Sequence, residues 1–226
     1  MMRQLLIVGA GGFGREVVET VRAINSVSPT WELLGFLDDR PDLQGREIDG
    51  TPVIGTTEAV GRFQEAQVVV STGNPRNYFS RKRLVSRLNL PPSRYATLIH
   101  PLAAVPRSVE IGPGSVLLAN VVATTRARVG AHVAIMPTVV LTHDDVVGDF
   151  VTIGAGTRFA GMVTVGEGAY IGAGVSVRET ISVGAWALVG MGAVVIDPVP
   201  PGEVWAGVPA RFLRKISVPE DVAQTA

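Results

Sequence analysis

Cysteine is missing from this chain of 226 residues, which excludes disulfide bonds, thiolate metal sites and a cysteine nucleophile. A chain without disulfides suits the reducing cytosol. The first residues also lack the charged segment, apolar core and small-residue cleavage site of a signal peptide. We therefore expect a cytoplasmic protein.

An excess of either charge is also missing, because 20 Lys and Arg residues balance 20 Asp and Glu residues. No basic stripe or charge run is present, so the sequence favours neither nucleic acid nor an anionic membrane as a partner. We interpret the densest basic stretch as the solvated face of a helix; it contains Arg76, Arg81, Lys82, Arg83 and Arg87. The most apolar run, at about 183–196, is interrupted by glycine, and we predict no membrane span.

The sequence does contain a repeat of six residues, in which an apolar residue recurs from Ile99 to Val195 without an insertion. The repeated positions are Ile99, Val105, Ile111, Leu117, Ala123, Val129, Ile135, Leu141, Val147, Ile153, Phe159, Val165, Ile171, Val177, Val183, Val189 and Val195. A period of six fits neither a helix nor a flat strand, and short fixed periods are typical of solenoids that bury an apolar face by stacking. We predict a parallel β-helix of hexapeptides.

A second column of mostly small or β-branched residues lies four positions after each apolar anchor, and Asp145 is its one charged member. The two columns resemble those of left-handed β-helix acyltransferases of the hexapeptide-repeat type, in which three hexapeptides close one triangular coil. Residues eighteen apart would then lie one above the other at the ~4.8 Å spacing of hydrogen-bonded strands. The left-handed sense is implied by the resemblance, because β-crossovers are usually right-handed.

The first hundred residues lack the repeat and alternate between strand and helix patterns. Apolar runs predict strands at 4–8, 33–37 and 68–71, and helical spacing predicts helices at 15–24 and 78–88. We expect an α/β, Rossmann-like parallel sheet with a glycine loop at its carboxyl edge. We place this domain at residues 1–97, an all-β left-handed parallel β-helix at 98–207 and a C-terminal tail at 208–226.

The segment Gly9-x-Gly11-x-x-Gly14 lies between the first predicted strand and helix, where glycines let backbone N–H groups approach a phosphate. We expect it to hold a nucleotide or a nucleotide-linked sugar. Two alternatives remain: a redox dinucleotide whose ribose is held by Asp38 or Asp39, and a loop of purely structural use. The redox alternative is disfavoured, because the short domain leaves room for only a truncated sheet and the solenoid offers no usual hydride-accepting site.

Three histidines are present. His100 opens the first hexapeptide at the domain junction, and His132 is predicted at a surface or corner position. His143 lies in an outward column of charged residues, directly before Asp144. A carboxylate beside an imidazole fixes its tautomer and raises its basicity, and Gly161 follows one coil later with an unobstructed backbone N–H. A base and an amide donor on adjacent coils suit acyl transfer.

Several motifs together resemble the NeuD and PglD family of sugar acetyltransferases, from about Gln4 to Lys215. They are the glycine loop, Phe36-Leu-Asp-Asp39, Thr72-Gly-Asn74, Thr142-His-Asp-Asp-Val-Val-Gly-Asp-Phe150 and Trp205-Ala-Gly-Val-Pro-Ala-Arg-Phe-Leu-Arg-Lys215. The resemblance implies a homotrimer with acetyl-CoA in a groove between neighbouring solenoids. It also implies that the N-terminal domain holds the nucleotide of a nucleotide-linked sugar.

Carried over by position, the resemblance implies three groups of site residues. His143 would be the general base, Asp144 the carboxylate that makes it more basic, and Gly161 the amide facing the thioester oxygen. The acetyl-CoA groove would be lined by Thr152, Gly161, Ala173 and Met191, with Arg214 and Lys215 either near the CoA phosphates or in a solvated tail. The nucleotide-linked sugar would be surrounded by Gly11, Gly12, Phe13, Asp38, Asp39 and Gly73.

The chain departs from the family pattern at three positions. A member that acts on amino sugars has His in place of Thr152, Asn in place of Met136 and Glu in place of Asp144. These differences affect one CoA contact, the choice of acceptor sugar and the reach of the carboxylate toward the imidazole.

The resulting hypothesis is direct transfer of an acetyl group from acetyl-CoA to an amino group of a nucleotide-linked sugar. An O-acetyltransferase of a sialic-acid-like sugar is the alternative within the class, and a non-catalytic nucleotide-sugar-binding protein is a third. A zinc enzyme like the γ-type carbonic anhydrases is disfavoured, because the histidines are 32 and 11 residues apart, and neither interval is a multiple of eighteen. We therefore expect no metal.

Overall fold

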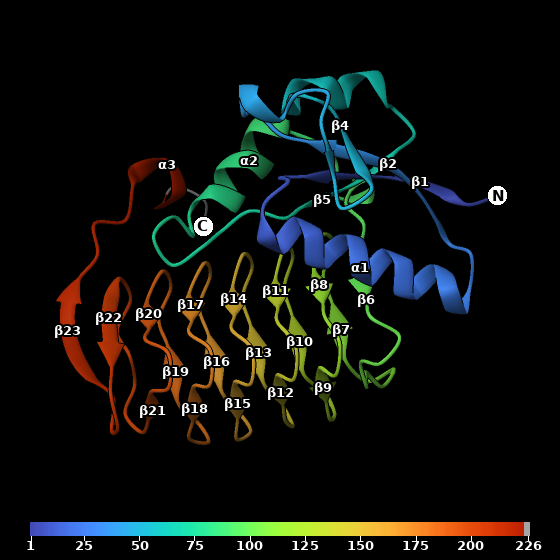
Figure 1. The fold of residues 1–226 in the computed structure, drawn as a ribbon. Helices are drawn as coiled ribbons and strands as arrows, with labels where there is room; N and C mark the ends of the chain where they lie inside the picture. Colours follow the sequence, from blue (N-terminus) through green and yellow to red (C-terminus); the bar gives the residue numbers. More distant parts are fainter. Residues whose placement is uncertain (224–226) are drawn as a thin grey trace.

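The computed structural model describes residues 1–223, in which an α/β domain packs along a stack of β-coils (Figure 1). The domain sheet has the strand order β3-β4-β2-β1-β5. Its strands are β1 (Arg3–Val8), β2 (Trp31–Leu37), β3 (Glu47–Ile48), β4 (Thr51–Gly55) and β5 (Gln67–Val70). All neighbours pair in parallel except β3 and β4. The apolar end of β1 is fully buried, as a parallel strand covered on both faces requires.

Helix α1 (Gly12–Val27) follows β1 and helix α2 (Ser80–Leu88) follows β5. The short 3₁₀ helices are η1 (Pro41–Leu43), η2 (Thr57–Arg62) and η3 (Pro92–Arg94). Helix α1 begins three residues before the predicted start, because Gly14 lets its first turn lie against the carbonyl group of Gly9. No helix within residues 1–223 is long and apolar enough to cross a membrane.

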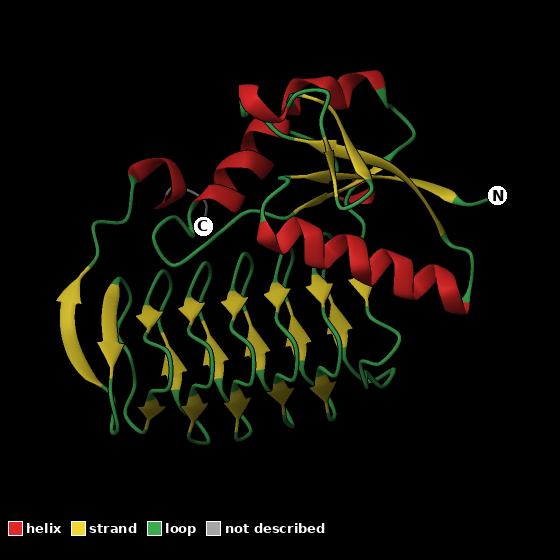
Figure 2. Ribbon diagram, in the orientation of Figure 1, coloured by secondary structure: helices red, strands yellow, loops and turns green. Residues whose placement is uncertain are grey.

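From residue 98 the chain forms short strands that stack in three sheets, named here after their first strands (Figure 2). The β7 sheet contains β7 (Glu110–Ile111), β10 (Arg128–Val129), β13 (Val146–Val147), β16 (Thr164–Val165) and β19 (Ser182–Val183). The β6 sheet contains β6 (Leu98–Ile99), β8 (Val116–Leu117), β11 (Ala134–Ile135), β14 (Thr152–Ile153), β17 (Tyr170–Ile171), β20 (Leu188–Val189), β22 (Glu203–Ala206) and β23 (Arg211–Lys215). The β9 sheet contains β9 (Val122–Ala123), β12 (Val140–Leu141), β15 (Arg158–Phe159), β18 (Ser176–Val177) and β21 (Val194–Val195).

Residues eighteen apart are paired in these sheets, as the repeat predicts. Val129 pairs in parallel with Ile111 on one side and with Val147 on the other. The apolar anchors from Leu117 to Val195 are at most 4% exposed and form one continuous core. Ile99 differs, because it lies in the first coil and is 36% exposed.

The coil has three edges where the chain turns. The domain edge joins the β7 and β6 sheets and includes residues 130–133, 148–151 and 166–169. The second edge joins the β6 and β9 sheets and includes 136–139, 172–175 and 190–193. The third edge joins the β9 and β7 sheets and includes 124–127, 142–145 and 160–163. Residues share an edge only when they differ by a multiple of eighteen or by a few positions in one turn.

The C-terminal segment folds back onto the molecule. Strand β23 pairs antiparallel with β22, although this segment was predicted to be part of a tail. Helix α3 (Glu220–Ala223) lies beside α2, where Asp221 forms an ion pair with Arg83 (Figure 1). Residues 224–226 of the predicted tail lie outside the described residues.

The stacking predicts a large difference between two glycine substitutions. A Cβ at Gly112 would lie 2.5 Å from the carbonyl carbon of Gly130 in the next coil, whereas a Cβ at Gly61 would meet nothing within 4 Å. We expect Gly112→Ala to lower the free energy of unfolding by about 1–3 kcal/mol, because the coils must separate. Gly61→Ala should leave it unchanged or raise it by up to about 1 kcal/mol. Chemical denaturation measures both, and equal effects would contradict this explanation.

Candidate functional site

A cavity of about 610 Å³ lies where the carboxyl ends of β1 and β5 meet the start of α1. Its lining consists of Gly9, Gly11, Gly12, Phe13, Asp38, Arg40, Ser71, Thr72, Gly73, Asn74, Asn77 and Ser80. Ligands bind at this edge in open α/β sheets. Five of the six residues predicted to surround the nucleotide-linked sugar therefore lie together, and Asp39 is the exception.

The start of α1 leaves room for a ligand beside its backbone. A Cβ at Gly11 or Gly12 would meet no atom within 4 Å. No side chain caps the first turn of this 16-residue helix, so its N–H groups are not satisfied by a cap. Such a turn can donate several hydrogen bonds to an anion, assisted by the helix dipole.

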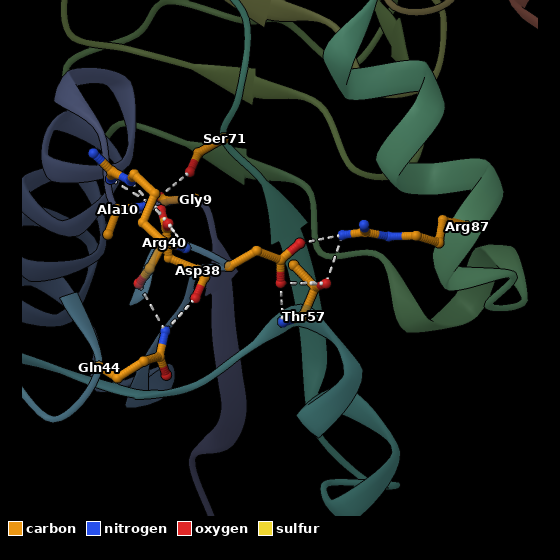
Figure 3. A network of polar contacts seen from close by, with 9 residues as sticks. Gly9, Ala10, Asp38, Arg40, Gln44, Thr57, Ser71 and Arg87 are labelled. Atoms are coloured by element: carbon orange, nitrogen blue, oxygen red, sulfur yellow. Dashed lines mark hydrogen bonds and ion pairs between the residues drawn. The ribbon is translucent and has the colours of Figure 1, made fainter. Parts of the chain in front are cut away.

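Asp38 joins the end of β2 to the glycine loop (Figure 3). The buried carboxylate accepts hydrogen bonds from the N–H of Ala10 at 2.8 Å and from Nε of Arg40 at 2.9 Å. Burial by itself raises the pKa of Asp38, but the hydrogen bonds from Arg40 and Ala10 outweigh it and the pKa is lowered. An ionised Asp38 therefore holds the wall of the cavity in place.

Asp39 contacts a different part of the domain, at η2 and α2. It accepts hydrogen bonds from the N–H and the hydroxyl group of Thr57, each at 2.8 Å, and from Arg87 at 2.6 Å. Burial by itself raises the pKa of Asp39. The hydrogen bonds from Thr57 and Arg87 have a larger opposite effect, so the pKa is lowered. Asp39 links η2 to α2 and borders a separate cavity of about 170 Å³.

His143 lies on the third edge with its side chain 52% exposed. Its Nδ1 atom is 3.0 Å from Oδ2 of Asp144, and Arg126, one coil earlier, forms an ion pair with the same carboxylate. The hydrogen bond with His143, supported by Arg126, lowers the pKa of Asp144. An ionised carboxylate only accepts hydrogen bonds, so Nδ1 is the donor in this bond and Nε2 is the ring nitrogen that remains to act as a base.

Gly161 lies directly beneath the imidazole ring. A Cβ at this position would lie 2.6 Å from Nε2 of His143, so only glycine lets the ring lie here. The N–H of Met162 donates to the carbonyl oxygen of His143 at 2.9 Å. Gly161 is buried under the ring.

Apart from Gly161, the residues predicted for the acetyl-CoA groove do not gather around His143 within one chain. Ala173 and Met191 lie on the second edge, because they are 30 and 48 residues from His143 and neither interval is a multiple of eighteen. Arg214 and Lys215 are exposed on β23. Thr152 is only 4% exposed on the β6 sheet, contrary to the expectation that it lines an open groove.

Arg81 explains why Thr152 is buried. Its side chain is 2% exposed and donates hydrogen bonds to Oγ1 of Thr152 at 2.6 Å and to the carbonyl oxygens of His132 and Thr72. Burial lowers the pKa of Arg81 to about 10.

Lys82 is 4% exposed and forms a 2.6 Å ion pair with Glu167. The prediction of a solvated basic face was therefore wrong for Arg81 and Lys82, because α2 packs on the domain edge.

His132 lies at a corner of the coil, one of the two positions predicted for it, but it is buried there rather than at the surface. Its ring stacks on Phe150 at a centroid distance of 5.0 Å and meets the edge of Tyr95. Burial lowers its pKa to about 4, so the ring is neutral at pH 7. The sequence feature that could have indicated this burial is Phe150, which lies one coil after His132.

Within residues 1–223, no three His, Asp or Glu side chains gather as metal ligands.

The lowered pKa of Asp38 predicts a pH-dependent contribution to stability. A carboxylate whose pKa is lower in the folded state stabilises that state above its unfolded pKa, and the contribution is lost as the pH falls through the folded pKa. We expect the melting temperature of the wild type to fall more steeply below about pH 5 than that of Asp38→Asn. The exposed Asp42→Asn is the control and should follow the wild type. Parallel curves for wild type and Asp38→Asn would contradict the assignment.

Comparisons with known proteins match both parts of the molecule. The family model described as the PglD N-terminal domain matches residues 4–88, which contain the glycine loop and Asp38. UDP-N-acetylbacillosamine N-acetyltransferase of Bacillus subtilis (strain 168) is 36% identical over 120 residues, or 52% of each protein. The match thus spans about half the length of this curated relative.

Solved structures extend the likeness to nearly the whole chain. The acetyltransferase domain of PglB from Neisseria gonorrhoeae FA1090, in complex with acetyl coenzyme A, is 31% identical with a TM-score of 0.82, covering 94% of this chain and 100% of that chain. A histidine-to-asparagine mutant of perosamine N-acetyltransferase from Caulobacter crescentus, in complex with CoA and GDP-perosamine, is 28% identical with a TM-score of 0.83, covering 95% and 99%.

These structures confirm the predicted fold class, a Rossmann-like α/β domain followed by a left-handed parallel β-helix. The glycine loop and the hydrogen bonds of Asp38 with Ala10 and Arg40 lie within the residues that the family model matches. Since a relative with 31% identity is matched along its entire length, the chain belongs to the NeuD and PglD family of hexapeptide-repeat sugar acetyltransferases.

Proposed function

We propose that the protein transfers the acetyl group of acetyl-CoA to an amino group of a nucleotide-linked sugar. The observation that carries this proposal is the exposed imidazole of His143, oriented by Asp144 with its basic nitrogen over Gly161. Relatives support it, because one was solved with acetyl coenzyme A and another with CoA and GDP-perosamine. The named activities of these relatives favour nitrogen over oxygen as the acceptor atom.

In the proposed reaction the sugar amine attacks the thioester carbon directly. Nε2 of His143 takes the amine proton as the C–N bond forms, and Asp144 stabilises the resulting imidazolium through Nδ1. The N–H of Gly161 would stabilise the charge that develops on the thioester oxygen. The C–S bond then breaks, and the proton on His143 passes to the sulfur so that CoA leaves as a thiol.

The cavity at the start of α1 is the proposed site for the nucleotide-linked sugar. Phosphate oxygens would accept hydrogen bonds from the first turn of α1, where Gly11 and Gly12 leave the backbone open. Asn74 and Asn77 border the same cavity and supply amide groups for a sugar or base. Met136 and Phe13 both pack against the same buried apolar cluster, so Met136 would offer the acceptor an apolar surface where a family member has Asn.

A homotrimer is the proposed assembly, because one chain does not bring the site together. The cavity belongs to the N-terminal domain, His143 to the third edge, and Ala173 and Met191 to the second edge. A groove between neighbouring solenoids would join the third edge of one protomer to the second edge of the next. Met191 is 78% exposed and Leu213 is 61% exposed, as expected for surfaces that a neighbour or CoA covers. Arg214 and Lys215 would then lie near the CoA phosphates.

The cytoplasm is the proposed location of the protein.

His143→Ala should lower turnover at least about 100-fold, because general base catalysis contributes ~100- to 10,000-fold. Binding of CoA should stay near that of the wild type, since the lost interaction is made in the transition state. Steady-state rates and calorimetric CoA titration measure the two effects. His100→Ala, at the domain junction, is the matched control and should retain activity. An undiminished rate in His143→Ala would refute the assignment.

Release of free CoA thiol from acetyl-CoA tests the proposed reaction. The acceptors to be compared are UDP-, GDP- and dTDP-linked amino sugars and free sialic acids. We expect thiol release with a nucleotide-linked amino sugar. Release with a free sialic acid alone would favour O-acetylation, and binding of a nucleotide sugar without release from any acyl donor would favour a binding protein.

A further inference from the structure

Asp145 is a buried charge that the proposed reaction does not use. Its side chain is fully buried in the inward column of the third edge. The residues at the same position in neighbouring coils of this edge are Ala127, Val163 and Ile181, all apolar and buried. Burial raises the pKa of Asp145, so the position disfavours the charged form and requires hydrogen bonds to hold it.

Both oxygens of Asp145 accept backbone hydrogen bonds. Oδ2 accepts from the N–H of Thr142 at 2.7 Å, within the turn that carries His143. Oδ1 accepts from the N–H of Val163 at 2.9 Å, in the next coil. One carboxylate therefore connects two consecutive coils, which an apolar residue in this column cannot do.

The two anchored amides flank the reacting groups. Thr142 directly precedes His143, and Val163 follows Gly161 by two positions. The same two coils are also connected by the hydrogen bond from the N–H of Met162 to the carbonyl oxygen of His143. Asp145 thus determines how far the base lies from the amide beneath it.

The charge of Asp145 also acts on the imidazole. The charged groups at this corner are Asp144, which bonds Nδ1, Arg126, which pairs with Asp144, and Asp145 behind the turn. His143 and Asp145 attract one another when the ring is protonated. Because Asp145 is fully buried, water and salt screen its attraction to the imidazolium less than they screen that of the partly exposed Asp144.

We propose that Asp145 is a positioning residue that holds the His143 turn against the Gly161 turn and supplies a second negative charge for the imidazolium formed during acetyl transfer. This inference rests on the proposed function. Asp145 touches neither substrate, and it acts through the backbone of the two turns and through its field at the ring.

Ser115 provides a matched control on the domain edge. It occupies the same inward column, is fully buried, and its hydroxyl oxygen accepts a hydrogen bond from the N–H of Val133 at 2.9 Å, eighteen residues later. Ser115→Ala therefore removes an equivalent bond between coils without touching the third edge. Loss of general stability should appear in both Asp145 and Ser115 variants, whereas a catalytic effect should appear only at Asp145.

The test compares Asp145→Asn, Asp145→Val and Ser115→Ala in the intact chain. Asn retains the shape of the side chain but loses the charge and presents an N–H group to one of the two backbone donors. We expect kcat to fall about 10- to 100-fold in both Asp145 variants, the range expected for a displaced catalytic group, with the KM for acetyl-CoA unchanged. Ser115→Ala should retain kcat. Equal kcat values in wild type, Asp145→Asn and Ser115→Ala would overturn the proposal.

An NMR titration of the His143 ring tests the same inference without turnover, with His143→Ala identifying the signal. We expect the ring to titrate at lower pH in Asp145→Asn than in wild type or Ser115→Ala. If the wild type transfers acetyl to no acceptor, the proposed function fails while the titration still tests the role of Asp145. An unchanged titration in Asp145→Asn overturns that role, whether or not the wild type is active. If Asp145→Val fails to fold, Asp145→Asn alone decides.

Discussion

Parallel strand pairing between residues eighteen apart is the interaction on which the rest of this structure depends. Val129 pairs with Ile111 in the coil before it and with Val147 in the coil after it, and the strands from β6 to β21 repeat this register. Each coil has too few residues to bury its own apolar face, so only the stack creates the core that runs from Val109 to Ala210. The same constraint fixes which side chains can meet, because a residue reaches its vertical neighbours and little else.

Exceptions to the apolar core therefore carry information. Ser115, Asp145 and Thr157 are fully buried polar members of the inward column. Each bonds to the backbone of a neighbouring turn, which satisfies groups that would otherwise be buried without partners. Only Asp145 is charged, and only Asp145 lies behind the exposed imidazole, which is why it and not its counterparts is assigned a role in the reaction.

The contact between the domains depends on a different arrangement. Arg81 is buried between the cavity loop at Thr72 and Gly73 and the β6 sheet at Thr152. Its donors are occupied by carbonyl and hydroxyl oxygens, and within residues 1–223 no carboxylate forms an ion pair with it. Removing such a side chain would leave several buried acceptors unpaired. Arg81 therefore connects the loop at Thr72 and Gly73, which borders the cavity, to the solenoid.

The sequence by itself determined the solenoid, the parallel α/β domain and the pairing of His143 with Gly161, because periods of six and eighteen are local and regular. It also located Asp38 and the glycine loop, since chain order places them at one edge of a parallel sheet. Only the tertiary structure decided which positions are buried between the domains. Arg81, His132 and Thr152 look exposed in the repeat or on an isolated helix, and they are buried because α2 packs on the domain edge. Likewise, the hexapeptide position shared by His143, Ala173 and Met191 recurs on all three edges, and the fold places His143 on the third edge and the other two residues on the second.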